Sequence, residues 1–227
     1  MLSILQQANS RKFRLRALAR YSTPMTTHLT SVTVLRTLYA APQERAVRKQ
    51  IAALDVHCRR FIEISPFFVL ATTDPHDKLD ASPRGGAPGF VKVNLDGDLL
   101  IPDAPGNNRL DSLENIIATG HAGLLFLIPG FDETLRVNGS AVVSFADADL
   151  AWFKDERRAP KTVIKVHVEA AYLHCAKAFL RSRLWDADAQ VKRTLMPTAG
   201  KMISDQTGIV VAPETQEEMA KRYAPDL

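Results

Sequence analysis

Two segments of the chain combine glycine, proline and arginine in a way that can bind an anion. The first, residues 80–90, reads Asp-Ala-Ser-Pro-Arg-Gly-Gly-Ala-Pro-Gly-Phe. Its glycines let a ligand approach the backbone closely, Ser82 offers a hydroxyl, and the planar guanidinium of Arg84 suits a phosphate. The second, residues 100–109, reads Leu-Ile-Pro-Asp-Ala-Pro-Gly-Asn-Asn-Arg and leads into a helical pattern.

The second segment predicts a strand, a tight turn over residues 105–109 and the start of a helix. The free N–H groups of a first helical turn and the helix dipole both favour negative charge, and Arg109 would strengthen such a site. A simpler interpretation also fits, in which both segments are ordinary turns, the arginines are solvated and Asn108 caps the helix. Neither segment has a Walker A pattern or a GxGxxG after a strand, which excludes P-loop and Rossmann sites.

Strand-length segments dominate the middle of the chain and must position these residues. Alternating or compact apolar patterns predict strands over residues 67–72, 79–83, 90–93, 99–102, 123–128, 134–145 and 163–171. A hairpin turn is expected over 94–98, and Gly139 is expected to mark a bulge or a close approach. Helical patterns cover residues 42–64 (with a break near Asp55), 110–117, 174–182 and 214–223. Six or seven strands with few long helices favour a closed antiparallel barrel, mainly β with peripheral helices, over a parallel α/β sheet.

Composition excludes several classes of function. The longest apolar run, residues 122–128, is too short to span a bilayer, so a membrane protein is not expected. The net charge of +4 is concentrated in the first 43 residues, which hold six Lys or Arg and no Asp or Glu. Nucleic-acid binding is not expected, because the remaining chain is slightly acidic. Cys58 and Cys175 lie outside any CxxC, which argues against a disulfide framework or a zinc site and favours two small buried residues of a reducing compartment.

The first residues have two interpretations. Residues 1–22 are acid-free, Arg-rich and loosely amphipathic, like a mitochondrial transit peptide. Alternatively, Met25 is the true start, or the first 24 residues are a flexible tail, and the protein is cytoplasmic. We expect an N-terminal extension over residues 1–41, a main domain with its own N-terminal helices over 42–185, and a helical tail over 186–227.

A series of motifs in this order resembles the pyridoxamine 5'-phosphate oxidase-like flavoproteins, in particular the branch with a Ser-Pro-Arg-Gly-Gly segment. The resemblance covers roughly residues 67–185, about half of the chain, and the ordered series is more specific than any one motif. The motifs lie at residues 81–86, 88–91, 100–103, 106–109, 114–116, 133–139 and 174–178.

The resemblance implies a six-stranded antiparallel split β-barrel, a homodimer, and FMN bound in the groove between the subunits. In such proteins a basic residue just before the helix contacts the FMN phosphate, and Arg109 matches that position. Arg109→Ala is therefore expected to weaken FMN binding more than Arg84→Ala does. The cofactor-binding residues that the resemblance implies are Ser82 and Arg84 beside the flavin, Ile101 and Pro102 at the ring edge, Asn107, Asn108 and Arg109 at the phosphate, and Lys177.

Lys177 lies in a short helical stretch that either reaches the partner subunit's flavin or is an ordinary amphipathic helix. His174 and Cys175 are adjacent and lack a third ligand, so no metal site is predicted, and His167 on a polar strand face is expected to be solvated. The vitamin B6 oxidases end in Arg-Leu followed closely by Pro, whereas Arg183 and Leu184 here precede Trp-Asp. Oxidation of pyridoxamine phosphate is therefore not implied.

Three functions remain open at this point. The first is an FMN-dependent oxidoreductase that acts on an unidentified small molecule, with the redox chemistry carried by the flavin. The second is a non-catalytic flavin-binding or storage module. The third, weaker possibility is a binder of haem or another planar ligand, although no axial ligand lies near the glycine-rich segment. No residue is recognisable as a catalytic acid or base.

Overall fold

The computed structural model describes residues 28–103, 106–210 and 212–226. Two compact units divide the chain at residue 44. The described residues of the first unit, 28–44, form helix α2 (Val32–Leu38), whose side chains are all exposed. Helix α3 (Glu44–Arg48) begins at the last residue of this unit. None of the helices in these ranges is both long and apolar enough to cross a membrane. The predicted extension up to residue 27, including Met25, lies outside the described residues.

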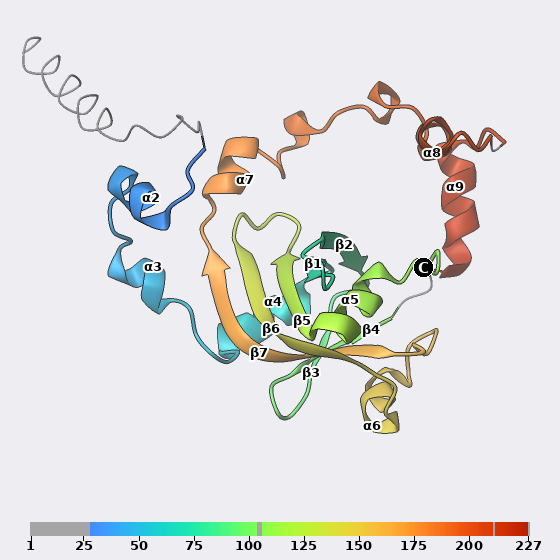
Figure 1. The fold of residues 1–227 in the computed structure, drawn as a ribbon. Coiled ribbons are helices and arrows are strands. Elements are labelled where there is room, and N and C mark those ends of the chain that lie inside the picture. The colour runs from blue at the N-terminus through green and yellow to red at the C-terminus, as the bar shows by residue number, and fades with distance from the viewer. Residues whose placement is uncertain (1–27, 104–105, 211, 227) are drawn as a thin grey trace, which may run out of the picture. The chain divides into compact units, whose positions relative to one another are not determined.

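A single antiparallel sheet of seven strands forms the second unit (Figure 1). Its spatial order is β2-β1-β5-β6-β7-β4-β3. The long strands β6 and β7 curve across the middle of this unit, with β5 beside β6. The bounds are β1 (Phe67–Thr73), β2 (Leu79–Gly85), β3 (Lys92–Val93), β4 (Leu99–Pro102), β5 (His121–Leu127), β6 (Thr134–Ser144) and β7 (Val163–His174).

The mainly β antiparallel class is confirmed, but the closed six-stranded barrel is wrong. The sheet has seven strands, and its edge strands β2 and β3 are not paired with each other. Strand β3 is only two residues long and pairs only with β4. On β2, Pro83 lacks the N–H group that a further ladder would need.

The helices of the second unit are short. Two of them, α4 (Val56–Ile64) and α5 (Asp111–Thr119), bury apolar side chains in the sheet's core. The predicted break near Asp55 is confirmed, because Asp55 is the N-cap of α4. The non-helical stretch is longer than expected: α3 already ends at Arg48, and Ile51 pairs with Ala171 of β7. The remaining elements are α6 (Asp147–Leu150), η1 (Ala151–Phe153), α7 (Lys177–Ser182), η2 (Ala187–Ala189), η3 (Arg193–Leu195), α8 (Ala199–Thr207), α9 (Gln216–Tyr223) and η4 (Ala224–Asp226).

The core consists of a main cluster and a small second one made of Leu100, Phe153 and Val163. Phe68 and Phe126, on neighbouring strands, are fully buried with ring centroids 5.0 Å apart, and α4 adds Phe61 and Ile62. Cys58 is buried as expected, and burial raises the pKa of its thiol to about 11. The expectation for Cys175 is wrong, because this residue follows β7 and is exposed.

Two predictions about the backbone are confirmed, the hairpin turn over 94–98 and the bulge at Gly139. The hairpin over 94–98 joins β3 to β4, with Gly97 in the left-handed region at φ 88°. The register of β6 and β7 shifts at Gly139, which leaves Glu169 as the extra residue. A Cβ at Gly139 would lie 1.8 Å from the carbonyl oxygen of His167, so close approach and bulge occur together.

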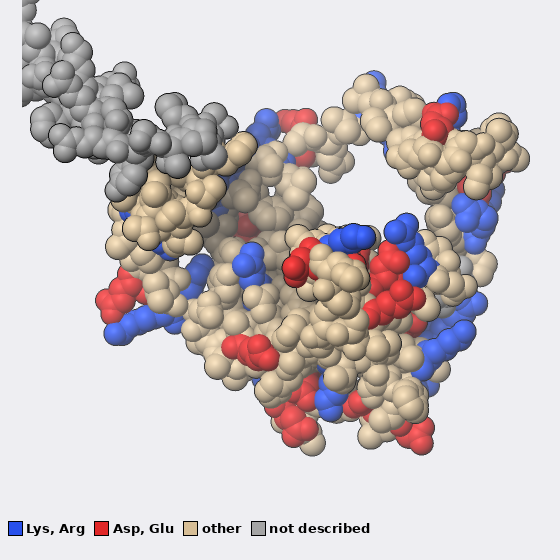
Figure 2. All heavy atoms as spheres, in the orientation of Figure 1, with Lys and Arg blue, Asp and Glu red and all other residues tan. Residues whose placement is uncertain are grey.

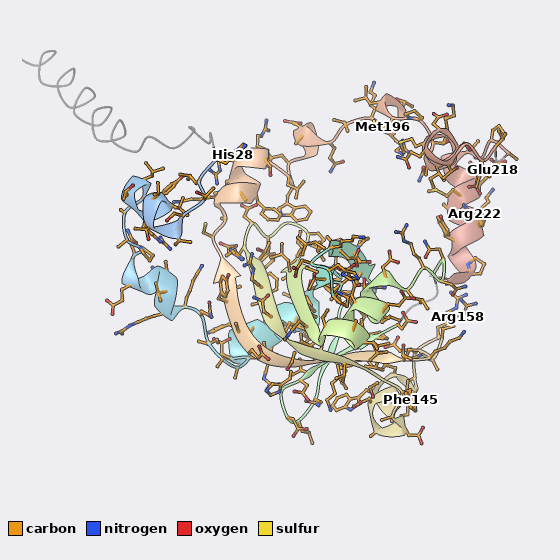
Figure 3. The ribbon with its side chains drawn as sticks, in the orientation of Figure 1. His28, Phe145, Arg158, Met196, Glu218 and Arg222 are labelled. Atoms are coloured by element: carbon orange, nitrogen blue, oxygen red, sulfur yellow. The ribbon has the colours of Figure 1, made fainter. Side chains whose placement is uncertain are left out.

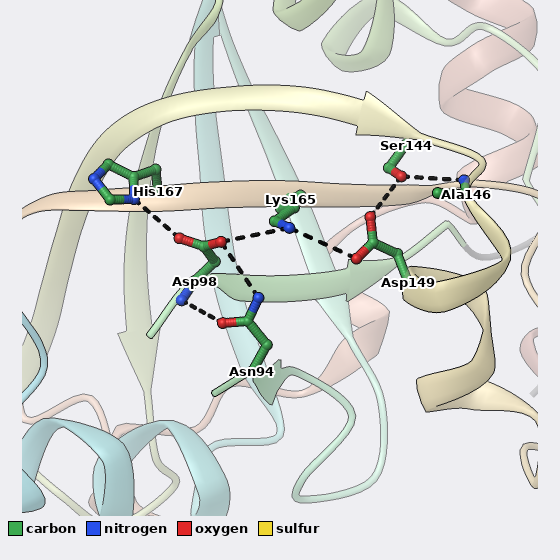
Figure 4. A network of polar contacts seen from close by, with 7 residues as sticks. All are labelled: Asn94, Asp98, Ser144, Ala146, Asp149, Lys165 and His167. Atoms are coloured by element: carbon green, nitrogen blue, oxygen red, sulfur yellow. Dashed lines mark hydrogen bonds and ion pairs between the residues drawn. The ribbon is translucent and has the colours of Figure 1, made fainter. Parts of the chain in front are cut away.

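A polar network joins this hairpin to β7 (Figure 4). The buried Asp98 carboxylate lies 3.0 Å from Nδ1 of His167 and 3.5 Å from Nζ of Lys165, and the Asn94 amide donates to it. Burial acts to raise the pKa of Asp98, but the His167 and Asn94 hydrogen bonds and the Lys165 charge hold it below its usual value. His167 is therefore exposed but not merely solvated.

Candidate functional site

A cavity of about 750 Å³ lies between β2, the residues that follow β4, the start of α5 and the loop before β7. Both anion-binding segments predicted from the sequence contribute to it. The lining residues are Asp80, Ala81, Ser82, Pro83, Arg84, Asp103, Gly106, Asn107, Asn108, Arg109, Leu110, Asp111, Ser112, Leu113, Arg158, Ala159 and Lys161. Pro105 of the predicted phosphate segment, like Ala104, lies outside the described residues.

Strand β2 presents alternate side chains to this cavity. Paired residues of neighbouring strands share a face, and Ser82 and Arg84 pair with the buried Leu70 and Phe68 of β1. Asp80 precedes them on the same face and accepts a hydrogen bond of 2.6 Å from the Ser112 hydroxyl of α5. This register turns a hydroxyl and a guanidinium inward.

Arg84 offers the cavity a donor that the described residues leave unsatisfied. Its Nε atom is buried and has no hydrogen-bond partner among the described residues. A buried donor without a partner costs about 1–3 kcal/mol, so a ligand acceptor at this position would be favoured. Because a guanidinium donates along a fork, a phosphate or carboxylate oxygen suits it best.

The turn before α5 differs from the one expected. Asn108 does not cap the helix; the N-cap is Leu110, which makes no side-chain capping bond. Both residues have φ 59°, while the Asn107 side chain accepts from the Arg109 N–H at 3.0 Å. The left-handed turn at Asn108 therefore replaces the side-chain cap and brings Asn107, Asn108 and Arg109 to the cavity.

Arg109 lies at the cavity's edge and is already engaged. Its side chain is 77% exposed, and Nε lies 2.5 Å from a carboxylate oxygen of Asp111. Asp111 and Glu114 place two carboxylates in the first turn of α5, which offsets the attraction of the helix dipole for an anion. The positive charge at the helix start is thus exposed and partly neutralised, whereas half-buried Arg84 keeps a buried donor without a partner among the described residues.

Three further charged residues, which no sequence motif marks as site residues, line the cavity: Asp103, Arg158 and Lys161. Asp103 follows β4, and its N–H donates to the Thr162 carbonyl at 3.0 Å. Burial raises the pKa of the Asp103 carboxyl, while the positive charges of Arg84 and Lys161 act to lower it. Arg158 and Lys161 come from the loop between η1 and β7, where Figure 3 labels Arg158. No sequence motif marks that loop, and only the fold brings it to the cavity.

Three predicted site residues do not line the cavity. The Ile101 side chain is 1% exposed and belongs to the core, and Pro102 follows it at the end of β4. The helix expected from His174 begins only at Lys177, the first residue of α7, because His174 is still the last residue of β7. The structure therefore brings together Ser82, Arg84, Asn107, Asn108 and Arg109, and leaves Ile101, Pro102 and Lys177 apart from them.

The charges of the cavity suit a small anion. Four of its side chains are cationic and three are acidic, namely Arg84, Arg109, Arg158 and Lys161 against Asp80, Asp103 and Asp111. On the face of the molecule shown in Figure 2, basic and acidic side chains of the described residues are interspersed. In those residues, no group of three or more His, Cys, Asp or Glu side chains could hold a metal ion. The arrangement favours a discrete phosphate-sized anion over an extended polyanion.

Comparison with known proteins identifies a family. Residues 54–175 match the family model described as pyridoxamine 5'-phosphate oxidase. None of the curated proteins compared with the chain matches it.

Several solved structures are similar at low identity. HupZ of Group A Streptococcus is 17% identical (TM-score 0.44; 52% of this chain and 91% of that one covered), and a putative pyridoxamine 5'-phosphate oxidase from Lactobacillus delbrueckii is 18% identical (0.41; 53% and 93%). HutZ, a haem storage protein from Vibrio cholerae, is 12% identical (0.36; 52% and 89%). Likenesses this distant do not bear on what this chain binds.

Proposed function

Because the chain belongs to the pyridoxamine 5'-phosphate oxidase family, we propose that it binds FMN and acts as an FMN-dependent oxidoreductase on a small molecule. The observation that carries this proposal is the half-buried Arg84 side chain in a cavity of about 750 Å³, because its buried Nε has no hydrogen-bond partner among the described residues. Ligand cavities of this size hold molecules as large as a mononucleotide.

The described residues fit the phosphate end of FMN. Arg84 and the Ser82 hydroxyl would hold the phosphate from β2, and Arg109 with Asn107 and Asn108 would approach it from the turn before α5. Ile101 and Pro102 would offer backbone groups to the ring edge, since the Ile101 side chain is buried. When bound, the flavin supplies hydride or electron transfer, and the protein orients it.

Two alternatives are separated by simple observations. A non-catalytic flavin carrier would hold FMN but show no bleaching of the flavin bands when reduced nicotinamides and a reductant panel are added. A haem binder would need an axial His, Cys, Met or Tyr, and none of the described residues that line the cavity is of these types. The cavity therefore favours flavin over haem.

A homodimer is part of the proposal. Phe68 and Leu70 on β1 face the core, so the alternate residues of β1 and its neighbours face away from it. Such an apolar surface is typical of an interface, and a second copy seated on it would border the cavity at Ala81 and Pro83. Lys177 of α7 would then approach the partner's flavin. The residues of this outward face are apolar or small and none is buried: Phe67, Val69, Ala71, Ala81, Pro83, Gly123, Leu125 and Leu127.

FMN should bind at least about 10-fold more tightly than riboflavin, because only FMN offers the phosphate that Arg84 can hold, and charge-assisted hydrogen bonds contribute about 1.5–3 kcal/mol. Absorbance spectra of the protein after mixing with each compound and gel filtration, followed by titration, measure this difference. Equal affinity would contradict the phosphate site, and no retention of either flavin would overturn the proposed function.

Val69→Asp should dissociate the dimer, with the dimer dissociation constant raised about 100-fold or more, because it places a carboxylate in the outward face between the apolar Pro83 and Leu125. Sedimentation velocity over a concentration series measures this change. Leu95→Asp is the matched control, since Leu95 is 97% exposed in the β3–β4 hairpin and should leave the dimer intact. A wild-type protein that is monomeric and still holds FMN would exclude a shared groove.

A further inference from the structure

The cavity contains a carboxylate, that of Asp103, for which the described ranges of the chain supply no close partner. Asp103 is half-buried, and its backbone is fixed by the hydrogen bond to Thr162. Among the described residues, neither a hydrogen bond nor an ion pair within 4.0 Å holds its side chain. The positive charges that act on it through space are those of Arg84 and Lys161.

We propose that Asp103 is the counter-ion of Arg84 and Lys161 in the ligand-free cavity, and that it takes up a proton when a phosphate-bearing ligand binds. This inference rests on the proposed function, because it requires a phosphate beside Arg84. It adds that binding of the cofactor is coupled to pH, and it names the residue that couples them.

The physical reason is competition for the same cations. Without ligand, Arg84 and Lys161 favour the ionised form of Asp103, while burial disfavours it and prevails, so its pKa is already raised. A phosphate at Arg84 offsets the two positive charges and adds a negative charge nearby. Both changes disfavour the carboxylate, so its proton affinity rises further and binding strengthens as the pH falls.

Other charged groups around the cavity do not replace Asp103 in this role. Asp80 accepts a hydrogen bond from Ser112, and Asp111 is paired with Arg109, so each of these carboxylates already has a partner within the protein. The charged groups that face the cavity are Asp80 and Arg84 on β2, Asp103 after β4, Arg109 and Asp111 at the start of α5, and Arg158 and Lys161 in the loop before β7.

Calorimetric titration of the full chain with FMN tests the inference. Titrations from pH 5.5 to 8.5, each in two buffers of different ionisation enthalpy, give the number of protons taken up on binding. The FMN phosphate itself titrates near pH 6, so the informative quantity is the difference between the wild type and Asp103→Asn. The wild type should take up an additional fraction of a proton, and its affinity should rise with falling pH by up to about tenfold per unit more than that of the variant. At pH 8, Asp103→Asn should bind FMN more tightly than the wild type.

Asp96→Asn is the matched control. It makes the same change of charge at an exposed position in the β3–β4 hairpin, where Asn-Gly forms the turn as readily as Asp-Gly, and should reproduce the wild-type proton uptake. Equal proton uptake by wild type and Asp103→Asn, or weaker FMN binding by Asp103→Asn at pH 8, would overturn the inference while FMN binding itself stands. Failure of all three proteins to bind FMN at any pH would remove the proposed function and this inference with it.

Discussion

Arg84→Ala is expected to weaken FMN binding by about 10- to 100-fold, the largest effect of any substitution in the cavity. The guanidinium lies on the cavity side of β2, and its buried Nε has no hydrogen-bond partner in the described part of the chain. Removing it eliminates charge-assisted hydrogen bonds of about 1.5–3 kcal/mol in a site partly shielded from water. Fluorescence titration of FMN measures the loss.

Arg109→Ala provides the comparison and should cost only a few-fold in affinity. Its side chain is largely exposed and paired with Asp111, and exposed ion pairs contribute at most about 1 kcal/mol. Burial thus reverses the order that the motif positions suggested. Arg84→Lys separates charge from geometry, because lysine keeps the charge but not the planar fork, and should fall between wild type and Arg84→Ala. If Arg109→Ala proves the more harmful, the phosphate lies at the helix start instead.

Gly139→Ala is expected to destabilise the fold by about 3 kcal/mol or more. The added Cβ would lie 1.8 Å from the His167 carbonyl oxygen, and both partners of this clash belong to backbones of paired strands. Neither can move without breaking the β6–β7 register, so the structure must strain or shift. Urea unfolding followed by circular dichroism measures the free energy of unfolding.

Gly106→Ala is the control for this prediction. A Cβ at Gly106 would meet nothing within 4 Å, and its φ lies outside the left-handed region, so the free energy of unfolding should change by less than about 0.5 kcal/mol. If Gly139→Ala unfolds at the wild-type urea concentration, the two strands do not approach at this point as described. Should the variant fail to accumulate in soluble form, Gly139→Ser should fail likewise while Gly106→Ala remains soluble.

Much of the fold follows from local patterns in the sequence. The apolar run after the Asp-Gly turn placed β4 at its observed bounds, and the strand pattern placed β6 to within a residue. The turn at Gly97 and the close approach at Gly139 were also evident, since few residues other than glycine satisfy those backbones. Each of these features depends either on residues close together in the sequence or on a position where glycine fits best.

The ends of some helices and strands, and the open edges of the sheet, depend on partners that are distant in the sequence. Strand β7 continues to His174, three residues beyond its expected end, because β6 pairs with it along that length. Ile51 lies in no helix, because its backbone bonds to Ala171. The sheet stays open because its edge strands β2 and β3 do not pair with each other. Hydrophobic alternation shows that a segment is a strand but not which strand it pairs with.

The sequence by itself determined the family, through motifs whose order is specific, and with it the five residues that meet at the cavity. Only the tertiary structure distinguished Arg84 from Arg109, since burial and the approach of Asp111 are not encoded in residue type. It also brought Lys161 beside Asp103, residues almost 60 positions apart, through the pairing of β4 with β7. Electrostatic energy depends on distance and solvent access, and both exist only after the chain has folded.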